Sequence, residues 1–262
     1  GFPAARASRR IARAMTTPRR PQIASHRGGA FLWPENSMTA FRETARLPVD
    51  QVECDVHLSA DGEVVIMHDA TLDRTTDARG PVVARSAAEL RTAVRVKGTG
   101  GEGVPMLADL AELIRPTKLL LRVEIKADAQ GLPYPGIVER VLAVLDATGM
   151  RERTVVIGFQ APTMAEAARA GGLAGVAWLL EAPWWRALDL AGAIAAARAH
   201  GVDEIGLPES LVDARVVAAV RAAGLGIGTW GANHAPSIQR MLALGVDVFA
   251  TDDPPLALRL RG

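Results

Sequence analysis

The feature of this sequence that most restricts its fold is a repeated alternation of short apolar runs with longer helical stretches. Strands that alternate with helices predict a parallel sheet covered by helices. Eight such units predict an α/β protein that closes into a (β/α)8 barrel, a TIM barrel, and an open doubly wound sheet is the alternative. The expected strands are Gln22–Ser25, Gln51–Val56, Leu119–Ile125, Thr154–Ile157, Leu173–Leu180, Asp203–Gly206, Leu225–Thr229 and Val246–Ala250.

Helical stretches fill most of the connections between these runs. Glycines such as Gly201, Gly224 and Gly245 stand directly after several of them, where a left-handed residue commonly ends a helix. Asn36 is a good N-cap for the first helix, because its side chain can accept a hydrogen bond from a free backbone N–H group. The expected helices are Asn36–Arg46, Gly136–Ala147, Pro162–Ala170, Trp185–His200, Val212–Ala223, Ala235–Leu244 and a last one from about Pro254.

The connection between the second and third strands, about residues 58–117, is far longer than a usual βα loop. It contains a β-like run, Glu63–Met67. Since βα loops surround the active site of a barrel, we interpret this stretch as a small cap-like insertion, with a surface decoration as the alternative. Residues 1–20 are interpreted as an N-terminal tail, disordered or left from cloning, and 21–262 as a single barrel domain.

Composition narrows the class of partner. The formal net charge is +1, so no global field directs the chain to nucleic acid. No apolar stretch has the length of a transmembrane helix, so stable membrane insertion is not expected. No signal peptide is recognised, which predicts a cytoplasmic protein, with a periplasmic or secreted mature form as the alternative. Abundant alanine and arginine indicate a GC-rich bacterial genome.

Acidic residues gather where the second and third strands end. Alternate residues of a strand share a face, so Glu53 and Asp55 point together, as do Glu124 and Lys126. Their apolar neighbours suit the helical shell, which leaves the acids to the barrel mouth. Three converging carboxylates favour a bound divalent cation, and an all-oxygen ligand set favours Mg²⁺ or Ca²⁺. A salt-bridge cluster with Arg27 and Lys126 is the alternative.

Two histidines are suited to acid–base chemistry, because imidazole titrates near neutral pH. His26 ends the first strand, and His68 follows the β-like run of the insertion. We interpret the other three, His57, His200 and His234, as structural, although His57 shares the strand face of the acids.

Together these residues resemble the motifs of the glycerophosphodiester phosphodiesterase family, of the PI-phosphodiesterase-like barrels. The likeness spans residues 22–258. It departs at Ser37, where the family usually has Thr, and at Gly231-Ala232 after the tryptophan. The matching motifs are His26-Arg27-Gly28, Pro34-Glu35-Asn36-Ser37, Glu53-Cys54-Asp55-Val56, His68-Asp69, Leu72-Asp73-Arg74-Thr75-Thr76, Glu124-Ile125-Lys126, Trp230 with Asn233, and Thr251-Asp252.

The resemblance implies metal-dependent hydrolysis of glycerophosphodiesters to sn-glycerol 3-phosphate and an alcohol. It implies His26 and His68 as the acid–base pair, and it implies that Arg27 and Lys126 bind the phosphate. The remaining implied roles are metal binding by Glu53, Asp55 and Glu124, and a wall of the glycerol pocket formed by Trp230.

Two other functions are compatible with the same residues. One is a phospholipase D-like hydrolase of lysophospholipids or sphingomyelin, for which Leu179–Trp185 is the candidate apolar loop. The other is a barrel that binds phosphodiesters without cleaving them. A generic metal-dependent aldolase or isomerase barrel would not require the pair His26 and His68.

Overall fold

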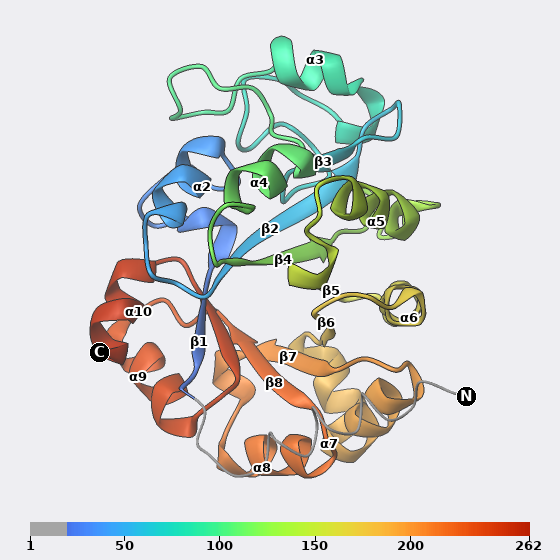
Figure 1. The fold of residues 1–262 in the computed structure, drawn as a ribbon. Helices are drawn as coiled ribbons and strands as arrows, with labels where there is room; N and C mark the ends of the chain where they lie inside the picture. Colours follow the sequence, from blue (N-terminus) through green and yellow to red (C-terminus); the bar gives the residue numbers. More distant parts are fainter. Residues whose placement is uncertain (1–19) are drawn as a thin grey trace.

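A computed structural model of the chain, which describes residues 20–262, contains a closed barrel of eight parallel strands (Figure 1). The first strand pairs in parallel with both the second and the last, and this pairing closes the barrel. The predicted (β/α)8 barrel is therefore confirmed. The barrel strands are β1 (Gln22–Ser25), β2 (Gln51–Leu58), β4 (Leu120–Ile125), β5 (Thr154–Gly158), β6 (Gly175–Leu179), β7 (Glu204–Pro208), β8 (Gly226–Trp230) and β9 (Val248–Thr251).

Helices surround the barrel on its outside, as Figure 1 shows. Within residues 20–262, none of them combines the length and the apolar character needed to cross a bilayer. The helices around the barrel are α2 (Met38–Ala45), α4 (Leu107–Ile114), α5 (Ile137–Ala147), α6 (Ala161–Ala170), α7 (Ala182–Ala199), α8 (Ala214–Ala222), α9 (Ala235–Leu244) and α10 (Pro254–Arg261).

Strand alternation separates the outer core from the barrel lumen. Cys54 of β2, Val123 of β4 and Phe249 of β9 are fully buried in the main core between sheet and helices. The alternate residues face inward, and Asp55 lies opposite Glu124 in the β2–β4 register. The alternation of side chains along each strand therefore places the acids of β2 and β4 on the lumen side.

The segment between β2 and β4 begins with β3 (Val64–Ile66), which pairs antiparallel with the end of β2. It continues through α3 (Ala87–Thr92) and has a small apolar cluster of its own that includes Leu72 and Leu90. In Figure 1 this teal segment lies at one end of the molecule, beyond β3. The later helix α4 instead contributes to the main core. The tail predicted for residues 1–20 lies, apart from Arg20, outside the described residues.

The N-cap of the first helix lies one residue after the predicted Asn36. Ser37 is the N-cap of α2, and its Oγ accepts a hydrogen bond from the backbone N–H of Ala40 at 3.1 Å. Asn36 has a left-handed backbone, with φ of 53°, and its buried side chain turns toward Asp55. The prediction of Asn36 as the cap is wrong because its amide is used inside the barrel mouth instead.

Candidate active site

A cavity of about 430 Å³ opens at the carboxyl ends of the strands and brings together the predicted site residues. All of them line it except Asp55, which is fully buried directly beside it. The cavity is lined by His26, Arg27, Glu53, His68, Arg122, Glu124, Lys126, Ile157, Phe159, Leu179, Glu181, Ala182, Gly206, Pro208, Gly228, Thr229, Trp230 and Ala250.

Three carboxylates form the centre of the charged side of this cavity. Glu53 and Asp55 come from β2 and Glu124 from β4, and one oxygen of each lies within 4.8 Å of the others. All three residues are buried. Glu53 Oε1 and Asp55 Oδ1 have no hydrogen-bond partner among the described residues. Buried, unpaired carboxylate oxygens are costly unless a cation neutralises them.

The electrostatics of the cluster are those of a cation site. Burial, reinforced by the charge of Asp55, raises the pKa of Glu53 to about 8 and the pKa of Glu124 to about 7. Burial also opposes ionisation of Asp55, but Lys126 and Arg27 outweigh it and lower its pKa. A divalent ion among the three acids would favour their ionised forms, so the donor set fits a hard, oxygen-binding metal.

Two cations flank the acids. Lys126 Nζ donates to Glu124 Oε1 at 2.9 Å and lies 3.9 Å from Asp55 Oδ1. Arg27 has a left-handed backbone, with φ of 51°, in the short 3-10 turn His26–Gly28. Its backbone N–H donates to Glu53 Oε2 at 2.8 Å, and its Nε lies 3.4 Å from Asp55 Oδ2. The turn thus aims the arginine at the acids of β2.

Asp252 anchors the first histidine, His26. The Nδ1 of His26 donates to Asp252 Oδ1 at 2.6 Å, while the Nε2 of His26 lies 3.9 Å from Glu53 Oε2. Asn233 holds the same carboxylate, because its Nδ2 donates to Asp252 Oδ2 at 3.0 Å. Burial would lower the pKa of His26, but Glu53 and Asp252 outweigh burial and raise it to about 9.

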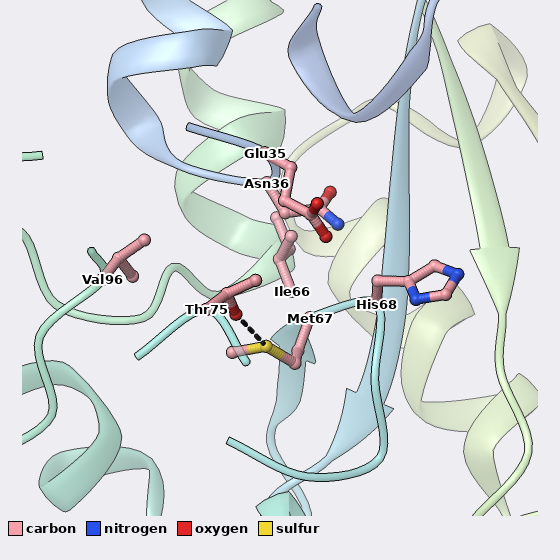
Figure 2. Close-up of a pocket in the computed structure, with 7 residues that line it drawn as sticks. All are labelled: Glu35, Asn36, Ile66, Met67, His68, Thr75 and Val96. Carbon is pink, nitrogen blue, oxygen red and sulfur yellow. Dashed lines mark hydrogen bonds between the residues drawn. The ribbon is translucent and has the colours of Figure 1, made fainter. Parts of the chain in front are cut away.

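The second histidine, His68, is anchored in the same way from the insertion. Its Nδ1 donates to Asp69 Oδ1 at 2.8 Å, and its Nε2 lies 3.4 Å from Lys126 Nζ. Burial and the Lys126 ammonium lower the pKa of His68 against the opposing charge of Asp55. Figure 2 shows the imidazole pointing away from Met67 and Thr75, its neighbours around a smaller pocket. Both histidines therefore keep Nδ1 on an aspartate and turn Nε2 to the charged cluster.

An arginine links Asp69 to the loop after β1. Arg74 Nε donates to Asp69 Oδ2 at 2.9 Å, and its Nη2 donates to Glu35 Oε1 at 2.7 Å. Glu35 also accepts from Arg27 Nη1 at 3.2 Å. In Figure 2, Glu35 and Asn36 lie side by side on that loop. The network thus connects the segment between β2 and β4 to the loop that follows β1.

His57 is buried in the structure, next to the second histidine. One ring nitrogen contacts the main-chain oxygen of His68 and the other contacts the hydroxyl of Tyr134. Burial is the main cause that lowers the pKa of His57. His200 lies away from the site, where its Nδ1 contacts the carbonyl of Ala196 in α7.

The opposite wall of the cavity is apolar. Trp230 packs edge-on against Phe159, with ring centroids 5.6 Å apart. Leu179 lies in the same apolar cluster. Gly206 and Gly228 leave room there, since a Cβ atom at Gly228 would lie 2.2 Å from Glu204 Oε1. Small residues on this side keep open a lumen that bulky side chains fill in many barrels.

Several residues of the site received no role from the sequence. Asp252, Asp69 and Arg74 belong to recognised motifs, but only their contacts show that they hold the two histidines. Adjacency to a histidine or to a strand end was the one signal available. The ion pair between the buried Arg122 of β4 and the partly buried Glu204 of β7 was missed, although Arg122 shares the strand face of Glu124.

Comparison with known proteins gives one consistent family. The model of the Glycerophosphoryl diester phosphodiesterase family matches residues 26–256. A glycerophosphodiester phosphodiesterase of Caldanaerobacter subterraneus subsp. tengcongensis is 29% identical over 247 residues, which cover 91% of this chain and 96% of that one.

Solved structures agree with this comparison. A crystal structure from Agrobacterium tumefaciens, provisionally described as a glycerophosphoryl diester phosphodiesterase, has 37% identity and a TM-score of 0.89. It covers 92% of this chain and 97% of its own. An Oleispira antarctica phosphodiesterase, solved with the product sn-glycerol-3-phosphate, has the same fold at 22% identity and a TM-score of 0.76, covering 92% of this chain and 96% of its own. The chain belongs to the glycerophosphoryl diester phosphodiesterase family and is a phosphoric diester hydrolase.

Proposed function

We propose that this protein hydrolyses glycerophosphodiesters to sn-glycerol 3-phosphate and an alcohol, by acid–base catalysis with His26 and His68 and with Mg²⁺ or Ca²⁺ as cofactor. One observation carries the proposal. Two imidazoles, each anchored through Nδ1 by an aspartate, turn Nε2 toward the same cluster of three carboxylates and two cations. A phosphodiester bound at that cluster has a proton acceptor and a proton donor within reach.

Glu53, Asp55 and Glu124 are the residues that would hold the metal. When bound, the ion supplies positive charge against the phosphate and its developing charge. The oxygens Glu53 Oε1 and Asp55 Oδ1 support this assignment, because they are buried and accept no hydrogen bond from the described residues. Oxygen-only ligands support Mg²⁺ or Ca²⁺ over zinc.

The chain's own residues account for the rest of the chemistry. Arg27 and Lys126 bind the non-bridging phosphate oxygens and orient the phosphorus. One histidine accepts a proton at Nε2 from the attacking hydroxyl, a new P–O bond forms, and the P–O bond to the leaving alcohol breaks. The other histidine donates its Nε2 proton to that alcohol. Trp230 and Phe159 exclude water from the side where the organic part of the substrate lies.

The identity of the relatives supports the substrate class. The Caldanaerobacter protein has the name glycerophosphodiester phosphodiesterase, and the Oleispira structure contains sn-glycerol-3-phosphate as product. The product also separates this function from the alternatives. A phosphodiester-binding barrel releases nothing, and a phospholipase D-like enzyme prefers lysophospholipid vesicles over a soluble diester.

The test is a product assay on glycerophosphocholine with the purified protein, followed by ³¹P NMR. We expect sn-glycerol 3-phosphate and choline. Release of phosphocholine would contradict the bond assignment. A transient cyclic glycerophosphate would identify the neighbouring glycerol hydroxyl as the nucleophile, and direct ¹⁸O transfer from water without it would identify water.

The metal is tested in the same assay after dialysis against a chelator. We expect turnover to be lost and to return when Mg²⁺ or Ca²⁺ is added, and Glu53→Gln should weaken metal binding measured by calorimetry. Full activity of the metal-free protein would overturn the metal assignment, because the three carboxylates would then have another role.

A further inference from the structure

The imidazole of His57 contacts the main chain of His68 itself. His57 Nε2 lies 2.9 Å from the carbonyl oxygen of His68. A carbonyl oxygen only accepts hydrogen bonds, so Nε2 is the donor and carries the proton. The contact leads from the interior of β2, where His57 is 1% exposed, to the residue that carries an imidazole into the cavity.

The other side of the His57 ring is fixed by Tyr134. The Tyr134 hydroxyl lies 2.7 Å from His57 Nδ1. Since Nε2 holds the proton of the neutral ring, Nδ1 accepts and the tyrosine hydroxyl donates. The two rings also meet edge to face, with centroids 5.6 Å apart and an interplanar angle of 88°. Tyr134 is itself buried and precedes α5, so a connection beyond β4 helps to orient the ring.

We propose that His57, oriented by Tyr134, is a positioning residue that fixes the main chain of His68 and thereby the place of its imidazole at the cluster. This inference rests on the proposed role of His68 in acid–base catalysis.

The surroundings of His68 explain why its main chain needs a positioning residue. We call the hydrogen bond from His57 to the His68 carbonyl the brace. His68 follows β3, so no barrel strand carries it, unlike His26, which directly follows β1. The Nδ1–Asp69 hydrogen bond fixes the ring, but Asp69 is the next residue of the same segment and moves with it. Past the β2–β3 ladder, Met67 N–H donates to Asp55 O at 3.0 Å, and the His57 side chain adds a bond from β2 to His68 itself. A displacement near 1 Å at a catalytic group can lower the rate by about 100-fold. Loss of the hydrogen bond from His57 should therefore lower kcat.

A matched pair of substitutions tests the donor. Glutamine and methionine have similar length, but only glutamine can donate to the His68 carbonyl. We expect His57→Met to lower kcat by about 10- to 100-fold, as loss of supporting hydrogen bonds around a site does. KM should stay within about twofold, because the cations and acids that bind substrate are untouched. His57→Gln should recover most of kcat. The control His200→Met, at the C-cap of α7 and away from the cavity, should leave both constants unchanged.

The outcomes separate this inference from the proposed function. Wild-type protein without turnover, or undiminished turnover in His68→Ala, defeats the proposed function. An active enzyme that needs His68 but has normal kcat in His57→Met overturns the brace alone. Equal losses in folded His57→Met and His57→Gln also overturn it, because the donor would then be irrelevant. If His57→Met unfolds below assay temperature, Tyr134→Phe decides: a lower kcat at constant KM supports the brace, and an unchanged kcat overturns it.

Discussion

The two sides of the barrel cavity differ in chemistry. The charged groups of one side come from β2, β4 and the residues that directly follow β1 and β4. They are both acids of β2, Glu124, Lys126 and His26. Strands β5 to β9 supply apolar and small side chains, such as Leu179, Gly206 and Trp230. Each charged group on the first side contacts another, whereas the second side has one edge-to-face aromatic pair. The first side therefore holds the groups proposed for metal binding and acid–base catalysis, and the second side determines the shape of the cavity.

This difference predicts that substitutions on the two sides of the cavity change different kinetic constants. Substitutions of the two histidines and of the aspartates that anchor them should act on kcat, because these groups are proposed to move protons in the transition state rather than to bind substrate. Substitutions on the apolar side should act on KM, because they change how well the organic part of the substrate is buried. A residue whose loss breaks this rule would show that the two sides are coupled.

The largest effect is expected from the two histidines. His26→Ala and His68→Ala should each lower kcat by about 10²- to 10⁴-fold, the usual contribution of a positioned acid or base. Steady-state assays on glycerophosphocholine measure this, and circular dichroism confirms the fold. His200→Ala is the matched control and should behave as wild type. Near-normal turnover in either active-site variant would remove that histidine from the mechanism.

The two anchoring aspartates should have smaller effects of the same kind. Asp252→Asn and Asp69→Asn keep the size of the side chain but lose the charge that holds Nδ1 protonated. We expect kcat to fall by about 10- to 100-fold in each, with little change in KM. The pH–rate profile should shift as well, because the histidine loses a stabilising carboxylate. A change in KM alone would mean that the aspartates act on binding.

Trp230→Ala is the corresponding test of the apolar side. The lost contact with Phe159 and with substrate should raise KM by about 10-fold, equivalent to about 1.4 kcal/mol, with kcat nearly constant. Trp184→Ala is the control, because that side chain is 65% exposed and does not line the cavity. If Trp230→Ala lowered kcat instead, the wall would take part in orienting the reacting phosphate.

Substitution of two glycines of β8 tests whether the small residues of the lumen are needed for stability. In Gly228→Ala the new Cβ would lie 2.2 Å from Glu204 Oε1 and 3.2 Å from Arg122 Nη2, so this partly buried ion pair must shift. We expect a loss of about 1–3 kcal/mol in unfolding free energy, measured by urea titration. Gly226→Ala is the matched control, since its nearest neighbours lie at 3.6 Å, an ordinary contact. Equal stability of the two variants would show that the pair has room to move.

The same comparison shows which parts of the site were predictable. Strand parity places Glu53, Asp55 and Glu124 together, because a period of two and a parallel register are local rules. The bond between His26 and Asp252 joins residues 226 positions apart and exists only because β9 closes on β1. Periodicity contains no such information. Asn36 was assigned to the wrong role for a related reason: its amide is an equally good cap or partner for Asp55, and only the chain path decides.

The smallest effect is expected at the rim of the charged side, where Arg74 joins Asp69 and Glu35. Hydrogen bonds from Arg74, against opposing desolvation, lower the pKa of both carboxyls. Their stabilisation is therefore present above the ordinary carboxyl pKa and is lost as pH falls through the lowered values.

Arg74→Gln should accordingly lower the free energy of unfolding by less than about 1 kcal/mol at pH 7, because Arg74 is half exposed and screened by solvent. The cost should shrink further as the carboxyls protonate. Chemical denaturation of chelator-treated protein at pH 7 and at about pH 3 measures both values, the lower pH lying below the usual carboxyl pKa. A cost that grows toward acid would contradict the sign. An equal cost at both pH values would mean that the network owes its stability to packing of the arginine stem rather than to its charge.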